Sequence, residues 1–389
     1  MVGRMADYGN NFVQLHNHTH YSLLDGGSKI PDLAKRAAEL GMPAVGITDH
    51  GNMHGAYEMY TNCVANGVKP IIGIEAYVTP ETARQDKSRV HWGTEAQRRD
   101  DVSGGGLITH LTMWAENDEG LVNLIKASSV ANLEGRVMRY PRMDKEVLAT
   151  YSKGVIASSG CPSGIIQTRL RLGQFEEALR AAGEFQDIFG KDNFFIELMD
   201  HGLTIETQVT NDLLTIAKKL NAPLLATNDS HYVLEEDRGA QDAMLCINSG
   251  SRLDDPDRFK FDGSGYYIKS AEQMRELFKD LPEACDNTLE IAERCNAMFD
   301  DGEDGAFMPQ FACPEGWDET SLFLKKVEEG LEKRYDGNPP LEVLKQADYE
   351  CGVICQMQFC GYFLVVADYI NWAKEHGVMV GPGQIGRAH

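Results

Sequence analysis

The sequence is poor in the features that mark several classes of protein. It carries 37 lysines and arginines against 59 aspartates and glutamates, and a formal charge of −22 argues against broad, nonspecific adhesion to nucleic acid. No run of eighteen apolar residues occurs, so we expect no transmembrane helix and no membrane partner. Residues 1–10 lack the apolar stretch of a signal peptide. These absences favour a cytoplasmic protein.

Cysteine is also sparse. Nine cysteines are scattered over 389 residues, and their odd number and spacing do not fit a disulfide framework. The paired CxxC motifs of a zinc ribbon are absent, and Cys351, Cys355 and Cys360 are interpreted as packing residues. The acidic balance does not exclude an active site for nucleic acid, because bound divalent cations would reverse the local field.

What the chain does contain is a regular alternation of apolar runs and amphipathic segments. The runs are rich in Val and Ile, and seven of them are expected to be strands, at residues 12–15, 44–48, 69–75, 106–115, 154–160, 193–199 and 223–228. Strand, helix, strand at this regularity predicts an α/β protein with a parallel sheet and right-handed crossovers. Seven such strands in this length are close to what a (β/α) barrel needs.

The alternation stops after about residue 285. The remaining segments have helical patterns separated by a linker rich in turn-forming residues. We therefore expect a first domain over residues 1–285 and a second, mainly helical unit over residues 286–389.

Three of the 11 histidines, His16, His18 and His20, occupy alternate positions near the start of the chain. A strand would place them on one face, which suits a metal better than an apolar core. In a parallel barrel, site residues lie at or just beyond the C-terminal ends of the strands. Reading those positions gives nine candidate ligands, which are His16, His18, Asp25, His50, Glu75, His110, Cys161, Asp229 and His231.

This set of side chains is typical of a metal centre. Imidazole, carboxylate and thiolate groups bind zinc, manganese or iron, and nine of them exceed what one tetrahedral ion can use. We therefore expect two or three divalent metal ions bridged by carboxylates, with zinc favoured by the histidines and the cysteine.

The roles of several other polar residues can be interpreted in two ways. His20 and His54 fit surface positions better than ligand positions, and His201 is equally compatible with a role near the site and with none. Asp49 either orients His50 or caps the next helix. Five arginines are candidates for phosphate contacts, although solvated charge is the commoner fate of such residues; they are Arg136, Arg139, Arg142, Arg169 and Arg171.

Several motifs resemble those of one family. HNHTHYSLLDG (16–26), GITDHGNMHGAYE (46–58), GCPSG (160–164) and ATNDSHY (226–232) resemble the polymerase-and-histidinol-phosphatase (PHP) domain. RFKFDGSGYYIKS (258–270) and GYFLVVADYINWAKEHGV (361–378) are similar to the bacterial DNA polymerase III α subunit, the C-family replicative polymerase. The resemblance covers nearly the whole chain.

The resemblance implies a distorted seven-stranded (β/α) barrel with a trinuclear metal site and a 3′–5′ exonuclease that proofreads DNA 3′ ends. It maps the family's ligands onto the same nine residues, and His16, Asp25, Glu75 and Asp229 are the candidate catalytic residues. In full-length polymerases of this kind the implied partners are the polymerase core and the sliding clamp. Residues 384–389, QIGRAH, replace a Gly/Ser-rich phosphate loop, so no polymerase activity is expected of this chain.

Two other functions remain open at this point. A small-molecule phosphoesterase of the histidinol phosphatase type would share the barrel and the ligands. A non-enzymatic scaffold could retain metals for folding alone, since the free energy of metal binding also stabilises the fold.

Overall fold

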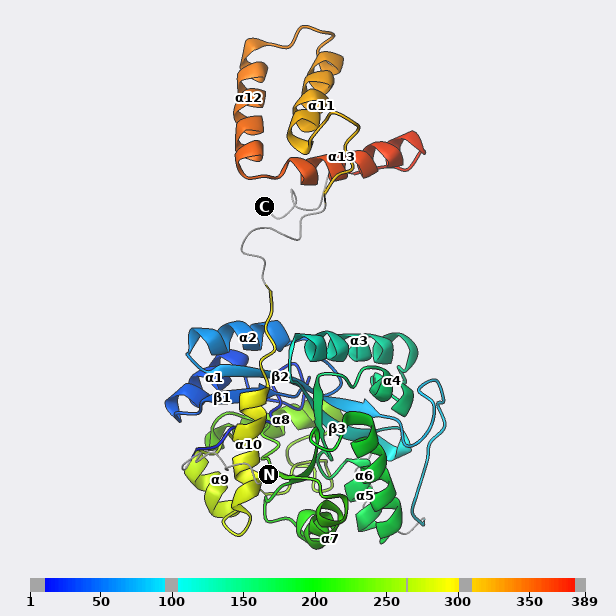
Figure 1. Ribbon diagram of the computed structural model, residues 1–389, viewed down its shortest axis with the longest axis vertical. Coiled ribbons are helices and arrows are strands. Elements are labelled where there is room, and N and C mark those ends of the chain that lie inside the picture. Colours follow the sequence, from blue (N-terminus) through cyan, green and yellow to red (C-terminus); the bar gives the residue numbers. More distant parts are fainter. Residues whose placement is uncertain (1–10, 95–103, 264, 301–309, 382–389) are drawn as a thin grey trace. The chain divides into compact units, whose positions relative to one another are not determined.

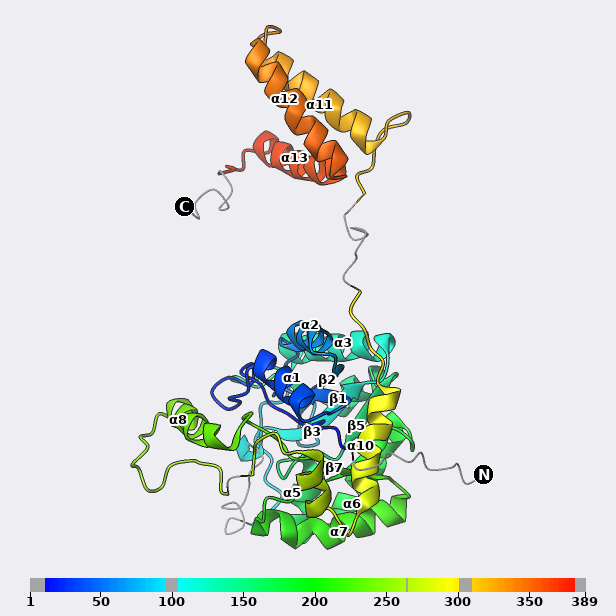
Figure 2. The same ribbon diagram turned by 90° about the vertical axis from the view of Figure 1, so that its left-hand side faces the viewer.

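A computed structural model describes residues 11–94, 104–263, 265–300 and 310–381. The expectations for residues 1–10 and for QIGRAH lie outside these ranges. The chain forms two compact units, which divide after Phe299 (Figures 1 and 2). The expected boundary at residue 285 falls inside a helix, α10 (Pro282–Arg294). That helix belongs to the first unit, because Asn287 donates to the Leu224 carbonyl at 2.7 Å and Leu289, Ile291 and Ala292 pack into the core of the first unit.

A curved sheet of seven strands forms the first unit. In spatial order the main path is β1 (Ala44–Ile47), β2 (Lys69–Val78), β3 (Thr109–Ala115), β5 (Val155–Ser158), β6 (Phe194–Leu198) and β7 (Leu224–Ala226), while β4 (Arg142–Met143) pairs with β2 beside it. Most strand residues are buried on both faces, which explains their almost continuous apolar runs. The expected α/β class and distorted barrel are confirmed.

The first predicted strand, residues 12–15, is not part of a regular ladder. Instead, isolated parallel bridges join Gln14 to Val45 and Asn17 to Ser230. These bridges connect the β1 edge to the chain that follows β7, and so draw the two edges of the sheet together. The seventh strand of the sheet is the short β4.

The prediction of a wholly parallel sheet is wrong at β3. This strand runs antiparallel to both neighbours, with Tyr77 opposite His110 and Ala115 opposite Val155. A parallel pair needs a crossover, usually a helix. The described residues between β2 and β3 contain a short 3-10 turn at Gly104–Gly106 and no α-helix, so the chain turns back on itself. The reversal brings the start of β3 to the rim where β2 ends.

Helices surround the sheet of the first unit (Figure 1). Besides α10 they are α1 (Ile30–Glu39), α2 (Ala56–Ala65), α3 (Asp118–Glu134), α4 (Lys145–Thr150), α5 (Ile165–Arg171), α6 (Phe175–Phe189), α7 (Thr204–Leu220), α8 (Arg238–Ser249) and α9 (Ala271–Leu277). Their apolar residues recur at helical spacing, as in α1, which buries Ile30, Leu33, Ala34 and Ala37. Side-chain caps occur at the starts of α3, α4 and α9; at α3 the Asn117 side chain accepts from the Gly120 amide at 3.0 Å.

The second unit is helical, as expected. It consists of α11 (Glu319–Arg334), α12 (Leu341–Gln356) and α13 (Cys360–Glu375), around a core of Leu322, Phe323, Cys360 and Leu364. All nine cysteines are free, in agreement with the sequence. In the described ranges no single helix is long and apolar enough to cross a membrane, although α12 and α13 pass that test together as a bent pair.

Candidate metal centre

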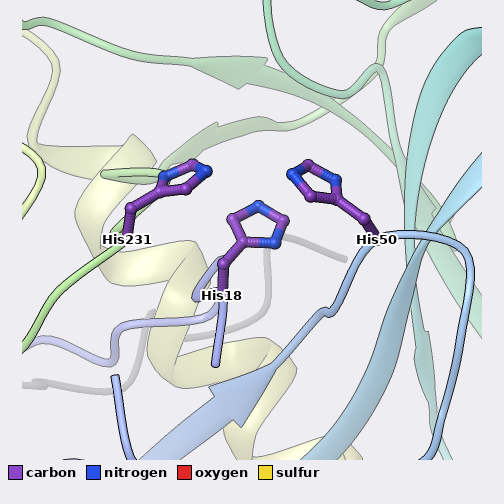
Figure 3. A group of neighbouring side chains, drawn as sticks. All are labelled: His18, His50 and His231. Carbon is purple, nitrogen blue, oxygen red and sulfur yellow. The ribbon is translucent and has the colours of Figure 1, made fainter. Parts of the chain in front are cut away.

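The nine predicted ligands come together at one rim of the sheet. His16 and His18 follow the first bridged segment, Asp25 lies in the next loop, His50 follows β1, Glu75 and His110 lie in β2 and β3, Cys161 follows β5, and Asp229 and His231 follow β7. Figure 3 shows the rings of His18, His50 and His231 facing one another. The His18 ring centroid lies 4.0 Å from that of His50 and 4.4 Å from that of His231.

Glu75 lies at the centre of the group and is fully buried. Its Oε2 lies 2.6 Å from His50 Nδ1 and 3.1 Å from His110 Nδ1, and its Oε1 lies 3.4 Å from His16 Nε2. The second of these histidines, His110, reaches the carboxylate because β3 is antiparallel. Cys161 completes this side, with Sγ 3.4 Å from His110 Nδ1. One carboxylate thus has imidazoles on several sides, as a bridging ligand would.

Two aspartates also belong to the group. Asp229 Oδ1 is 2.9 Å from His18 Nε2 and 3.4 Å from His16 Nε2, and Asp25 Oδ2 is 3.1 Å from His50 Nε2. The backbone of Asp229 has φ +44°, in the left-handed region that a non-glycine residue adopts at some cost. Such strain is typical of residues whose side-chain position serves a function.

Three overlapping groups in the described ranges have the geometry of a metal site. They are His18 with His50 and His231, His16 with His18 and Glu75, and His50 with Glu75 and His110. Within each group the possible ligand atoms all lie within 4.8 Å of one another. Because neighbouring groups share His18, His50 or Glu75, the arrangement suits more than one ion.

The facing atoms lack hydrogen-bond partners, which tests whether a cation fits. His16 Nε2, His18 Nε2, both Glu75 oxygens and Asp229 Oδ1 are buried and make no hydrogen bond. Buried polar groups are almost always satisfied, and leaving one unpaired costs about 1–3 kcal/mol. Several unpaired lone pairs that point into one space are accounted for by bound cations. The residues present therefore fit the predicted divalent metals.

Hydrogen bonds on the outer side of the rings determine which nitrogen faces inward. His16 Nδ1 lies 2.7 Å from Glu197 Oε1, and His231 Nδ1 lies 2.7 Å from the Asp229 carbonyl oxygen, which can only accept. Both Nδ1 atoms therefore carry a hydrogen and donate it. Nε2 is left as the atom that can bind a metal.

His18 is oriented through two further residues. Its Nδ1 lies 3.2 Å from Ser22 Oγ, and the Ser22 hydroxyl donates to Asp49 Oδ1 at 2.6 Å. Since the single Ser22 hydrogen is used by Asp49, the serine oxygen accepts from His18 Nδ1. Asp49 also accepts from the amide and hydroxyl of Thr19 at 2.6 and 2.7 Å. Both expected roles of Asp49, orienting His50 and capping a helix, are replaced by this one.

Glu197 was not among the predicted residues. It is fully buried in β6, where it contacts His16 and the hydroxyls of Ser158 and Thr227. The sequence signal was a lone acid inside the apolar run of residues 193–199. A search restricted to the ends of predicted strands does not include such a residue.

We expect Glu197→Gln to weaken divalent metal binding about 10- to 100-fold, the usual effect of losing the partner of a metal-bound histidine. Glutamine has almost the same volume as glutamate, but its neutral amide would no longer hold the His16 ring in one orientation as the carboxylate does. Metal affinity, measured by competition with a fluorescent chelator, checks this. Glu206→Gln is the matched control, because Glu206 pairs with His201 Nδ1 at 2.6 Å outside the candidate ligands. Equal losses in both variants would contradict a specific role for Glu197.

The electrostatics of the group depend on charge of both signs. Burial lowers the pKa of His16, but the carboxylates of Asp229 and Glu197 outweigh it and raise the pKa well above the ordinary value. Burial, aided by His50 and His231, lowers the pKa of His18 to about 3.

Burial would raise the pKa of Glu75, yet His110 and His50 hold it well below the usual range. Burial raises the pKa of the Cys161 thiol, so a cation is needed to keep it as thiolate.

These shifts predict how metal binding responds to pH. The pKa of His50 is also raised above its ordinary value, since burial is outweighed by Tyr77 and Glu75. Because protonation of His16 and His50 is favoured in this way, protons compete with a cation for both rings. We expect proton release on binding and an affinity that falls as the pH falls from about 8 to 6. Titration calorimetry in two buffers of different ionisation enthalpy measures the release, and an affinity independent of pH would contradict the expectation.

Several of the remaining histidines and arginines make their contacts outside the nine candidate ligands. His20 and His54 are exposed, and His201 Nε2 lies 3.0 Å from the Asn228 carbonyl oxygen. Arg142 is fully buried and donates to four backbone carbonyls, those of Arg84, Asp86, Leu107 and Gly135. Arg169 pairs with Glu81 and covers the Trp92 ring. For Arg142 and Arg169 the structure therefore favours a structural role over phosphate contact.

Comparison with known proteins agrees with this geometry. The model of the PHP domain family matches residues 14–201, and that of the bacterial DNA polymerase III alpha NTPase domain matches residues 321–387. The fold of the first unit is thus that of a PHP domain.

Curated relatives narrow the assignment further. The chain is 51% identical over 377 residues to DNA polymerase III subunit alpha of Mycobacterium tuberculosis, covering 97% of this chain and 32% of the relative. It is 41% identical over 375 residues to the same subunit of Treponema pallidum, covering 96% and 31%. The chain belongs to the DNA polymerase III α subunit family, and it spans about a third of the length of the curated relatives it matches.

Solved structures give only weak likenesses. An amidohydrolase from Chromobacterium violaceum is 14% identical with a TM-score of 0.35, and covers 57% of this chain and 87% of its own. A two-domain protein from Bacteroides vulgatus, predicted to contain a PHP-like metal-dependent phosphoesterase, is 14% identical with a TM-score of 0.32, and covers 72% and 63%. Likeness at this level adds nothing to the assignment.

Proposed function

We propose that the first unit is a metal-dependent 3′–5′ exonuclease that removes nucleotides from the 3′ end of DNA and proofreads for a replicative polymerase in the cytoplasm. The observation that carries the proposal is the set of buried, unpaired imidazole and carboxylate atoms facing one space. Homology to DNA polymerase III α subunits supports a DNA substrate and, in the whole protein, a polymerase core and a sliding clamp as partners.

The ions would be held by the nine predicted residues, which are His16, His18, Asp25, His50, Glu75, His110, Cys161, Asp229 and His231. Two or three ions fit the overlapping groups, and zinc suits the imidazoles and the thiolate, while manganese and iron are compatible with the carboxylates. When bound, such ions polarise phosphate oxygens and lower the pKa of water.

Exposure distinguishes the deeply buried members of this ligand set from those that lie nearest to solvent. The side chains of His16 and Glu75 are at most 1% exposed, so they would hold the ions from the buried side of the site. Those of Asp25 and Asp229 are 23% and 14% exposed and form the mouth of the site. A phosphodiester would approach there, beside Asp25, the more exposed of the two carboxylates.

The loop that carries Asp25 is tightly fitted to the chain beneath it. Gly26 passes so close to Thr19 that an added Cβ would lie 2.2 Å from the Thr19 carbonyl oxygen. The amide of His18 donates to the Ser230 carbonyl at 2.8 Å, which joins the first ligand segment to the last. Positioning of this kind is the main contribution a protein makes to phosphoryl transfer.

A choice among substrates tests the proposal. The purified chain should shorten a 3′-hydroxyl DNA strand stepwise and should hydrolyse a phosphomonoester such as p-nitrophenyl phosphate far more slowly. The reverse preference would indicate a small-molecule phosphoesterase instead.

A metal-stabilised scaffold is the other candidate, because His16, His18 and Glu75 are fully buried, as purely structural ligands would be. A folded, metal-loaded chain that cleaves neither substrate would favour that role.

A further inference from the structure

A row of aromatic rings leads away from the candidate metal centre on the side of His231. The Phe261 ring packs edge-on against the His231 ring, with centroids 4.6 Å apart. The Phe259 ring packs edge-on against Phe261 at 6.0 Å, and Tyr266 supports Phe261 at 4.8 Å. Two ring contacts thus connect a candidate ligand to Phe259.

Phe259 is the last ring of this row and lies at the surface. It is 61% exposed, whereas Phe261 and Tyr266 are half-buried. Lys260, between the two phenylalanines, is exposed as well. Phe259, Lys260 and Phe261 thus place an aromatic, a basic and an aromatic residue in succession. Aromatic faces that stack bases beside cations that attract the backbone are the two elements of single-strand binding sites.

The segment is held in place by its own contacts. Arg258 forms a two-pronged salt bridge with Asp242 of α8, both N–O distances being 2.6 Å. Its Nε also donates to the Leu253 carbonyl at 3.2 Å. Figure 2 shows α8 and the chain after it extending from one side of the barrel. A ring fixed before binding loses little conformational entropy when a ligand stacks on it.

We propose that Phe259 and Phe261 form the nucleobase-binding part of the substrate site, with the base of the terminal nucleotide stacked on Phe259 and Lys260 beside its backbone. The inference rests on the proposed function, since it assigns the substrate a direction of entry past His231. A nucleobase is the occupant we favour over a protein surface because the rings continue directly from the residues that would hold the phosphate.

Two variants test the stacking directly. Phe259→Ala should weaken binding of a labelled single-stranded oligothymidine about tenfold, as expected for loss of one stacked base. Phe259→Trp should bind as wild type does and show fluorescence quenching when the oligonucleotide is added. Val122→Trp is the matched control. Val122 is an exposed apolar residue of α3, a helix that follows the end of β3 remote from His110. The fluorescence of the Val122→Trp variant should not change when the oligonucleotide is added.

A substrate lacking the terminal base separates this inference from the nuclease proposal. Wild type should prefer an intact 3′ end over a 3′ abasic end about tenfold in KM or in binding, and Phe259→Ala should lose that preference. If DNA is cleaved but Phe259→Ala keeps the preference and the affinity, the inference is wrong while the proposed function stands. If no DNA is cleaved, yet Phe259→Trp is quenched and Phe259→Ala binds weakly, nucleobase binding stands and the nuclease does not. Absence of quenching and of any affinity change overturns the inference in either case.

Discussion

Replacing Glu75 by glutamine is expected to abolish hydrolysis and to remove bound metal. Its two oxygens lie within 3.4 Å of three imidazole nitrogens, and the carboxylate belongs to two of the three groups that could hold an ion. The amide has the same shape, but it has lost the negative charge that offsets the cations. We expect the loss of activity to be at least about a hundredfold, the upper end of what a supporting residue costs.

Elemental analysis and cleavage of end-labelled DNA by the same preparation check this expectation. Glu116→Gln is a suitable control, because Glu116 pairs with Arg294 rather than with a histidine. A Glu75→Gln protein with full metal content and normal cleavage would remove Glu75 from the site.

Removing the metal is expected to destabilise the first unit. Without cations, buried carboxylates and imidazoles are left with unpaired atoms facing one another. A ligand present at about a thousand times its Kd stabilises the folded state by about 4 kcal/mol. For a unit of this size that corresponds to a fall in Tm on the order of 10 °C after chelation.

The effect should be confined to the unit that holds the site. Hydrogen exchange after chelation should quicken in β2, β3 and the segment of residues 12–19, and should remain unchanged in α11–α13. An unchanged Tm in chelated protein shown to be free of metal would contradict a metal-supported fold.

Much of the architecture could be predicted because the relevant signals are local. Val- and Ile-rich runs between amphipathic segments indicate an α/β sheet whatever its final curvature. The candidate ligands were found for a similar reason: their side chains are of metal-binding types and fall at the ends of predicted strands. The positions of His50 and His231 after β1 and β7 follow directly from that rule.

The errors came from features that depend on contacts distant in sequence. The direction of β3 is set by a connection without an α-helix in its described residues. An apolar run by itself does not indicate whether its strand is parallel or antiparallel to its neighbours. His110 still reaches the rim, but because its strand starts there. Glu197 was missed because it lies within β6, before its last residue, and its contact with His16 joins segments far apart in the sequence. The burial of Arg142 depends on carbonyls from three separate segments.

The decisive experiment for a metal-dependent nuclease is cleavage of a 3′-mismatched, end-labelled primer by protein reconstituted with known amounts of metal. We predict stepwise loss from the 3′ end that rises with bound metal up to two or three ions per chain, stops with chelator, and is lost in Asp25→Asn and His16→Ala. A folded chain with its full complement of metal and no cleavage would contradict it, and the centre would then be a structural one.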